Sequence, residues 1–547
     1  GVNTAVLDSY TSELMFVDAM KMSRKWIASD ADCRGCAWES GVKVPLDANG
    51  YPLQIPYSDG KKPPQLVKTL MLDGGGLHPA GDYTLMFDGK GEIQLEWDTG
   101  TKSFKTAGAY PVKISQPKQG VLLTIKSSKK EDPIRNIRFI LPGFAGTYEE
   151  EPFYPPFLDL MRGAGTIRYG DLMQMNSQPC SNGVSGYDPS CVTLWKDRTT
   201  ADTLQQTLKT GVALEYLAKL SNTLDANMWI TLPTGADDDY VRQAALLLKS
   251  ELNPHLKVYL EWSNEVWNFG FPQASFARDR AQQMGLTSDC YYNQSYYAHH
   301  TAEIFKIFNE AFGDPDRVIN VLGSQAALAN CAEAMLKYQS DPKMNPTGYK
   351  AEALAIGAYF GHDIGDKIAK EGLVDSITVD QILDRANKAV DDHVLKWTKD
   401  NKKVADKYGV ILIAYEGGQH LVATGDNVNN KTLTDKLVAA NRHPRMYALY
   451  QKMFDAWYNN GGKLFAAYNN VGGFSKWGSW GLVETLKAPP EKAPKYTAWQ
   501  DRLETLGATL TPRCDDGIDN DGDTLIDYGE DSTCRSKNGN YESDLYQ

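Results

Sequence analysis

Hydrophobic and polar positions divide the chain into three parts with different patterns. Over residues 1–135, short alternating runs broken by glycine and proline are typical of a small antiparallel sandwich. The exception is a helical pattern at residues 13–26. Short apolar runs alternate with longer amphipathic stretches from residue 136 to 508, and residues 509–547 form an Asp-rich tail. The alternating runs of the first part lie at residues 69–72, 81–87, 92–97, 110–114 and 121–126.

The middle part predicts strands that alternate with helices. Eight strands in such an alternation are the number that a (β/α)8 TIM barrel requires. We therefore predict an α/β fold: a TIM barrel with an N-terminal β-sandwich-like domain and a short Asp-rich calcium-binding tail. The strand candidates are residues 137–141, 166–169, 228–232, 258–261, 318–322, 354–359, 410–415 and 464–468. The helix candidates are residues 214–224, 239–252, 296–312, 379–408, 445–458 and 497–506.

A second arrangement of the barrel fits the same pattern. In it, residues 1–7 supply the first strand, and the sandwich is inserted after that strand. The sequence leaves both arrangements open.

Two of the strand candidates end on glutamate. The apolar run 258–260 passes into a polar stretch that ends on Asn264 and Glu265, and the run 410–414 passes into Tyr415, Glu416 and two glycines. Charge at the end of a buried strand is costly unless a site uses it, and active sites lie at the carboxyl ends of barrel strands. Either segment alone could be a strand that enters a polar turn. Two facing carboxylates, however, are what a glycosidase requires.

With these residues the chain resembles clan A of the glycoside hydrolases, which are retaining enzymes built on a (β/α)8 barrel. That clan carries Asn-Glu at the end of strand 4, with the glutamate as acid/base, and a nucleophilic glutamate at the end of strand 7. Asn264, Glu265 and Glu416 stand at the matching positions. The resemblance covers about residues 137–506 and supports the clan rather than one family within it. It implies cleavage of β-glycosidic bonds in a polysaccharide or oligosaccharide.

The resemblance also implies roles for neighbouring residues. Arg168 ends a strand where the clan has an arginine that touches the nucleophile, although an ion pair with Asp171 is an equal alternative. Tyr359 would bond the nucleophile, or it is a core aromatic residue. Asn264 would bond the 2-hydroxyl of the sugar, or it is a turn residue.

Three tryptophans are candidate sugar-binding residues. Trp477 and Trp480 lie in a glycine-rich loop after the last strand, where a flat ring offers a stacking platform for a pyranose. Trp195 lies on the long loop 173–200, and loops of this length in a compact domain are usually functional.

Charge and cysteine content narrow the function classes. The net charge of −12 argues against nucleic acid as a partner, and no apolar run approaches the length of a membrane span. We expect no catalytic metal and no organic cofactor, because no cluster such as His-Glu-x-x-His and no phosphate-binding glycine loop is present. The cysteines fall into pairs, which favours disulfides and a secreted (extracellular or periplasmic) protein. The pairs are Cys33/Cys36, Cys180/Cys191, Cys290/Cys331 and Cys514/Cys534.

The tail carries aspartates at alternate positions. Asp519, Asp521, Asp523 and Asp527 stand at positions 1, 3, 5 and 9 of an EF-hand-like loop, where oxygen ligands can surround Ca²⁺. This stretch resembles a single thrombospondin type 3 calcium repeat, which implies one structural Ca²⁺. The alternative is a solvated acidic linker.

Two other function classes compete with a glycosidase. One is a non-catalytic carbohydrate-binding or cell-surface calcium-binding protein on a barrel scaffold, and the other is an enzyme of different chemistry on the same fold. We favour the glycosidase because both glutamates stand at strand ends.

Overall fold

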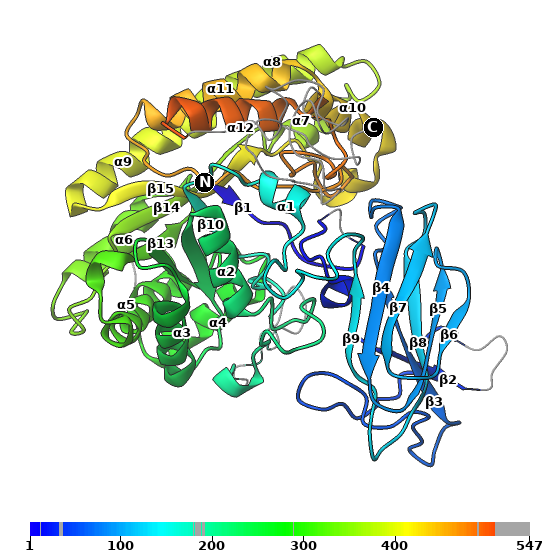
Figure 1. Ribbon diagram of the computed structural model, residues 1–547. Helices are drawn as coiled ribbons and strands as arrows, with labels where there is room; N and C mark the ends of the chain where they lie inside the picture. Colours follow the sequence, from blue (N-terminus) through cyan, green and yellow to red (C-terminus); the bar gives the residue numbers. More distant parts are fainter. Residues whose placement is uncertain are drawn as a thin grey trace.

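The computed structural model describes residues 1–10, 13–31, 37–178, 180, 188, 192–287, 289–489 and 492–508. Within these residues the chain forms a barrel surrounded by helices and, beside it, a unit of two antiparallel sheets (Figure 1).

Seven parallel strands form the barrel sheet. Their order is β1 (Val2–Asn3), β10 (Thr166–Arg168), β11 (Asn227–Leu232), β12 (Val258–Trp262), β13 (Val318–Ser324), β14 (Ala353–Phe360) and β15 (Ile411–Gln419). Residues 464–468 close the ring, because Phe465 forms a parallel bridge to Ala414 of β15 and Ala467 forms one to Val2 of β1. The sheet is therefore a TIM-type barrel with eight strand positions.

Alternation of side chains along these strands creates two cores. Residues that point outward pack under the helices in the main core. A separate cluster fills the barrel interior, as expected for a small closed barrel; it contains Trp229, Val321, Ala353, Ala355, Ile413 and Tyr415. Beyond this cluster, the carboxyl ends of the strands carry polar residues.

Amphipathic helices cover the outside of the barrel (Figure 1). The predicted helices 214–224 and 445–458 are confirmed at their full length. The helices are α1 (Pro155–Asp159), α2 (Leu214–Leu224), α3 (Asp238–Glu251), α4 (Pro272–Gln283), α5 (Tyr292–Phe312), α6 (Ala329–Ser340), α7 (Ile364–Lys370), α8 (Val379–Ala389), α9 (Lys396–Tyr408), α10 (Lys431–Arg442), α11 (Arg445–Tyr458) and α12 (Pro494–Thr505), with a π turn, η4 (Val390–Leu395), between α8 and α9. The described residues also form four 3-10 turns: η1 (Ala19–Met22), η2 (Trp195–Asp197), η3 (Pro315–Arg317) and η5 (Gly425–Asn429).

Two antiparallel sheets lie beside the barrel (Figure 1). One has the order β2 (Ile27–Asp30), β3 (Gln65–Met71), β8 (Val121–Ser128), β5 (Gly91–Trp97) and β6 (Lys102–Phe104). The other has the order β7 (Gly108–Ile114), β4 (Gly81–Asp88) and β9 (Arg135–Ile140). Alternate residues of β4 are buried, and Phe104 of the first sheet packs 4.9 Å from Tyr110 of the second, measured between ring centroids.

The first barrel strand is not the run 137–141. That run belongs to β9, which pairs with β4 in the antiparallel sheet, while β1 takes the first barrel position beside β10. The two-sheet unit is thus inserted between the first and second barrel strands. An apolar run of this length suits a parallel or an antiparallel strand equally, and two residues of β1 are too few to show a period.

The helix predicted at residues 13–26 is also wrong. Only the short 3-10 turn η1 forms there. Outside this turn the backbone of the segment bonds to residues 141–154: Val17 N–H donates to the Pro152 carbonyl and Tyr154 N–H donates to the Met15 carbonyl. Tertiary pairing has overridden the helical period.

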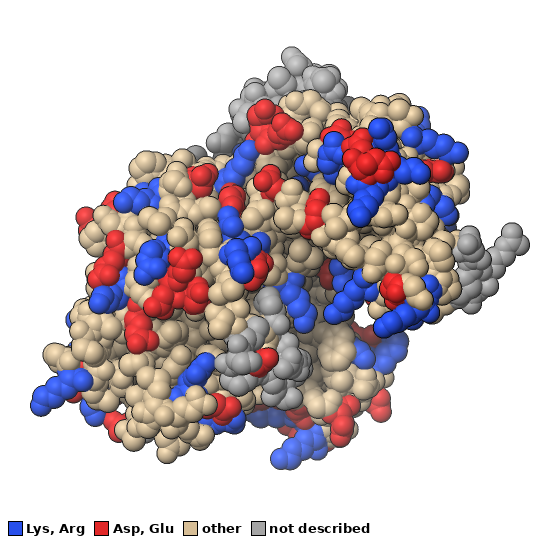
Figure 2. Space-filling view, turned by 90° about the horizontal axis from the view of Figure 1, so that it is seen from below, with Lys and Arg blue, Asp and Glu red and all other residues tan. Residues whose placement is uncertain are grey.

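The surface charge and the hydropathy of the described helices are as the composition leads us to expect. Basic and acidic side chains are interspersed over the face shown in Figure 2. No helix in the described part of the chain is long and apolar enough to span a membrane.

Candidate active site

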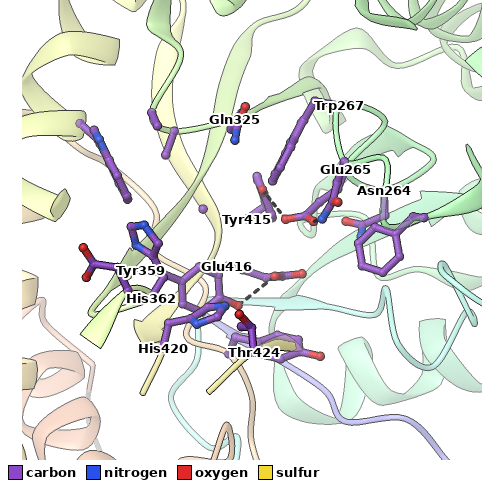
Figure 3. Close-up of a pocket in the computed structure, with 18 of the residues that line it drawn as sticks. Asn264, Glu265, Trp267, Gln325, Tyr359, His362, Tyr415, Glu416, His420 and Thr424 are labelled. Carbon is purple, nitrogen blue, oxygen red and sulfur yellow. Dashed lines mark hydrogen bonds between the residues drawn. The ribbon is translucent and has the colours of Figure 1, made fainter. Parts of the chain in front are cut away.

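A cleft of about 810 Å³ opens at the carboxyl ends of the barrel strands. Residues that follow β12, β13, β14 and β15 line most of it. Figure 3 shows Glu265 and Glu416 in this cleft, with Trp267 above them and His420 below. Its lining includes Asn264, Glu265, Trp267, Gln325, Tyr359, His362, Tyr415, Glu416, His420, Thr424, Tyr468 and Trp480.

Glu265 stands in a tight turn beyond the end of β12. Ser263 and Glu265 both have left-handed backbone angles, with φ of 59° and 42°, and such residues cost on the order of 1–3 kcal/mol each. The turn is held from outside: Gln273 Nε2 donates to the Asn264 carbonyl at 2.7 Å. Asn293 Nδ2 donates to the Val266 carbonyl, also at 2.7 Å. These contacts fix the carboxylate of Glu265 toward the cleft.

Two neutral groups donate hydrogen bonds to the partly buried carboxylate of Glu265. Tyr415 Oη donates to Oε1 at 2.8 Å, and Asn268 Nδ2 donates to Oε2 at 2.9 Å. Neither partner carries a charge.

Glu416 lies within β15 and is only 7% exposed. Arg168 Nη1 donates to its Oε1 at 2.9 Å, and Tyr359 Oη donates to its Oε2 at 2.9 Å. The two glycines that follow are required by close packing. A Cβ at Gly417 would lie 2.3 Å from the ring of Phe465, and Gly418 has a φ of 147°.

Arg168 is a fully buried cation beneath the cleft. Its Nη1 donates to Glu416 Oε1, and its Nε donates to Glu261 Oε2 at 3.0 Å. Its Nη1 also donates to Asn3 Oδ1 at 3.2 Å, and its Nη2 donates to Asn264 Oδ1 at 2.8 Å. One guanidinium thus joins groups from β1, β10, β15 and the end of β12.

Glu261 is a second buried carboxylate for which the sequence suggested no role. Besides Arg168, Trp229 Nε1 donates to its Oε2 at 2.9 Å and Thr231 Oγ1 does so at 3.2 Å. With these donors Glu261 anchors Arg168 inside the barrel. The feature of the sequence that could have indicated a role for Glu261 is its position next to the apolar run of β12.

Glu265 and Glu416 differ in the groups that lower the pKa of each carboxyl group. Burial raises the pKa of Glu416, and the Glu265 carboxylate raises it further, whereas the Arg168 cation and the Tyr359 hydroxyl lower it. Burial also raises the pKa of Glu265, which among the described residues has no cation in direct contact and is stabilised as an anion mainly by Asn268 and Tyr415. Two such groups share a proton at intermediate pH. The direct ion pair with Arg168 favours the charged form of Glu416.

Tyr415 reaches the site because the barrel sheet is irregular there. The pairing of β14 with β15 shifts register between Ile356 and Gly357, so that Gly357 pairs with Glu416. A bulge lets two consecutive residues serve one site. Space for the Tyr415 ring comes from Gly357, since a Cβ there would approach its hydroxyl to 3.2 Å.

The structure brings most of the sequence-predicted residues together. Asn264, Glu265, Tyr359, Glu416 and Trp480 line the cleft, and Arg168 lies below it.

The remaining predicted residues lie elsewhere. Trp477 is 67% exposed and does not line the cleft. Trp195 packs edge-on against Tyr240, with ring centroids 5.4 Å apart, and under the guanidinium of Arg198. The predicted calcium ligands Asp519, Asp521, Asp523 and Asp527 lie outside the described residues.

Several cleft residues were not singled out from the sequence. Trp267 follows β12 and lines the cleft, and His420 follows β15 with its ring 4.8 Å from that of Trp480. Burial lowers the pKa of His420 to about 4, so it is neutral near pH 7. Asn268 and Gln325 are polar loop residues without a distinguishing pattern.

One group of residues in the described part of the chain has the spacing of metal ligands. Ligand atoms of His362, Asp363 and His393 lie within 4.8 Å of one another. Two of the three already have partners: Asp363 pairs with Lys367 at 2.5 Å, and His393 Nδ1 accepts from the Gly361 N–H at 3.3 Å. Protein partners account for this group, and we assign no metal to it.

The chain is similar to several solved structures at low sequence identity. No protein-family model and no curated protein sequence matches the chain. Among solved structures, a GH51 arabinofuranosidase from Xanthomonas axonopodis pv. citri is 12% identical, with 57% of this chain and 59% of that chain covered and a TM-score of 0.33. A 4-O-α-L-rhamnosyl-β-D-glucuronidase from Fusarium oxysporum is 10% identical, with 66% of each chain covered and a TM-score of 0.37. A xylanase 10C from Cellvibrio japonicus, in complex with xylopentaose, is 9% identical, with 89% of this chain and 98% of that chain covered and a TM-score of 0.35.

The chain thus spans less than two thirds of the length of the first two structures. These neighbours are glycosidases by name. The strand order and the closure by residues 464–468 define the fold. Together with the two glutamates in the cleft, they define a TIM-type barrel protein with a carboxylate pair at the carboxyl ends of its strands.

Proposed function

We propose that this protein is a glycoside hydrolase that cleaves β-glycosidic bonds in a polysaccharide or oligosaccharide by a retaining double displacement. The observation that carries the proposal is the pair Glu265 and Glu416, which share one cleft in unlike surroundings. A glycosidase of this type needs one carboxyl group that is protonated and one that is charged.

In the first step Glu416 attacks the anomeric carbon and forms a covalent glycosyl ester. Glu265 gives its proton to the oxygen of the leaving sugar, so that the glycosidic bond breaks without an alkoxide leaving group. In the second step Glu265 takes a proton from water, which attacks the anomeric carbon and releases Glu416. The sugar keeps its original anomeric configuration.

Other cleft residues support these steps. Asn264 is oriented by Arg168 and by Asn176, whose Oδ1 accepts from its Nδ2 at 3.1 Å, and in this mechanism it meets the 2-hydroxyl. Trp267 and Trp480 line the cleft on the sides of β12 and of the closing segment 464–468, where their rings can stack on sugar rings. His420 is a neutral group beside Trp480 that can bond a sugar hydroxyl.

The proposal is tested on a panel of plant, algal and microbial polysaccharides by measuring the release of reducing ends. Proton NMR of the first product gives its anomeric configuration, with Glu416→Gln as the inactive control. We expect retained product and a separation of about 5–5.5 Å between the two carboxyl groups in a crystal structure. Inverted product would exclude the double displacement. Binding of a polysaccharide without any cleavage would favour a non-catalytic carbohydrate-binding protein.

We further propose that the protein is secreted and that its tail binds one structural Ca²⁺ through Asp519, Asp521, Asp523 and Asp527. The disulfide between Cys290 and Cys331 supports an oxidising compartment, and Cys180 is also disulfide-bonded. The spacing of the aspartates supports Ca²⁺. Calorimetric titration of the full chain, with Asp521→Asn as comparison, tests the tail. A full chain that binds no calcium at millimolar concentration would exclude the site, and removal of Ca²⁺ should leave turnover largely intact.

A further inference from the structure

A second cavity lies between helices α5 and α6, which pack side by side (Figure 1). Its volume is about 190 Å³, room for roughly six water molecules. Its walls come from residues 287–298 and 334–344, and among the described residues it shares no lining residue with the catalytic cleft.

The amide of Gln294 is the unusual group in this cavity. Gln294 lies in the first turn of α5 and is 1% exposed, yet within the described chain neither its Oε1 nor its Nε2 has a hydrogen-bond partner. Burying an amide without partners is costly, and buried amides in folded proteins normally have them. A group of this kind that lines a cavity is positioned to bind something that enters it.

Gln339 nearby shows the ordinary case. It is 4% exposed, and its Nε2 donates to the Ala298 carbonyl and to Thr301 Oγ1, each at 2.9 Å. Its Oε1 accepts from the Ala351 N–H at 2.9 Å. A glutamine between the same two helices is thus fully hydrogen-bonded where its role is to hold the helices together.

The walls of the cavity are held in place before any ligand arrives. The disulfide between Cys290 and Cys331 joins the segment that leads into α5 to helix α6. The bond from Gln339 to Ala298 joins the two helices a second time. A largely preformed cavity with a few placed polar groups is typical of small-molecule sites.

The lining selects a neutral ligand with both polar and apolar faces. Lys337 and Asp289 form an ion pair of 3.0 Å at the exposed rim, so their charges compensate. Met335 contributes apolar surface, and Tyr338 also lines the cavity, with its hydroxyl hydrogen-bonded to His299 Nδ1 at 3.0 Å. The amide of Gln294 offers a donor and an acceptor side by side. Two neighbouring hydroxyl groups match that arrangement.

We infer that this cavity binds one neutral sugar ring, with two adjacent hydroxyls on the Gln294 amide and an apolar face of the ring on Met335. The choice of a sugar rests on the proposed function, because a glycosidase releases such sugars.

The experiment measures binding of D-xylose, L-arabinose, D-mannose and D-glucose by saturation-transfer NMR and calorimetry. Gln294→Leu removes the amide at similar size, and Ala334→Phe fills the mouth of the cavity. Gln282→Leu makes the same chemical change at an exposed position of α4, and Glu265→Gln disables the cleft. We expect at least one sugar to bind at millimolar concentration to the unchanged chain and to the two controls. Both cavity variants should weaken that binding about 10-fold or more.

Gln294→Leu should also melt at the same temperature as the unchanged protein or higher, because it removes unpartnered buried polar atoms. If it fails to fold, Ala334→Phe decides the question. Equal binding by the cavity variants and the unchanged chain, or a crystal soaked in sugar that shows only water in the cavity, would overturn the inference. Sugar binding here without hydrolysis in the cleft would defeat the proposed function alone, and hydrolysis without binding here would defeat this inference alone.

Discussion

The ends of strands β12 and β15 each bring a glutamate into the same cleft, and the surroundings of the two carboxylates differ. Glu416 lies within its strand, is 7% exposed and contacts the Arg168 cation. Glu265 lies three residues beyond its strand, in a turn with a φ of 42°, and its hydrogen-bond donors, Tyr415 and Asn268, are neutral. In the proposed mechanism the environment, and not the residue type, therefore separates the two roles.

Removal of either carboxylate should give the largest effect. With Glu416→Gly the covalent step is lost and activity should collapse, and azide should restore turnover with inverted product because it attacks in place of the carboxylate. With Glu265→Gly the loss should be about 10²–10⁴-fold, greatest for poor leaving groups, and azide should give retained product. Anomeric NMR of the azide adducts distinguishes the two. The same stereochemistry from both variants would mean that the roles are not divided in this way.

Arg168→Gln should affect stability as well as activity. It leaves Glu261 and Glu416 buried without their cation, which costs about 3–5 kcal/mol and is measured by urea unfolding. Because the cation lowers the pKa of Glu416, its loss raises that pKa, and the acidic limb of the pH–rate profile should move to higher pH. Arg198→Gln, which breaks the ion pair with Glu215 away from the cleft, is the control and should leave the profile unchanged.

Tyr359→Phe removes one donor from the charged carboxylate. Hydrogen bonds to charged groups contribute about 1.5–3 kcal/mol, so kcat/KM should fall about 10- to 150-fold. The Tyr359 hydroxyl lowers the pKa of Glu416, and without it the acidic limb should again move to higher pH. A shift of the alkaline limb instead would assign Tyr359 to the acid/base.

Tyr415→Phe is the matched change on the other side. The Tyr415 hydroxyl lowers the pKa of Glu265, so its loss raises that pKa, and the alkaline limb should move to higher pH while the acidic limb stays. A bond to a group that is neutral at rest contributes about 0.5–1.5 kcal/mol, which corresponds to a loss of about 2- to 12-fold in kcat/KM. Movement of the acidic limb by this variant would contradict the assignment of Tyr415 to Glu265.

The sequence by itself determined the alternation of strands and helices and the two apolar strand segments that lead to Glu265 and Glu416. These features depend on local period and on the cost of burying charge, which neighbouring residues reveal. The assignment of residues 137–141 to the barrel failed because an apolar run does not state which strand it pairs with.

Only the tertiary structure decided how the site is assembled. Arg168 joins Glu416, Glu261, Asn264 and Asn3, residues separated by up to several hundred positions along the chain. Tyr415 serves Glu265 through a register shift against β14 that leaves no trace in the period of β15. Both depend on which strands are neighbours and in what register, and a register is fixed by packing across the whole barrel rather than by any one segment.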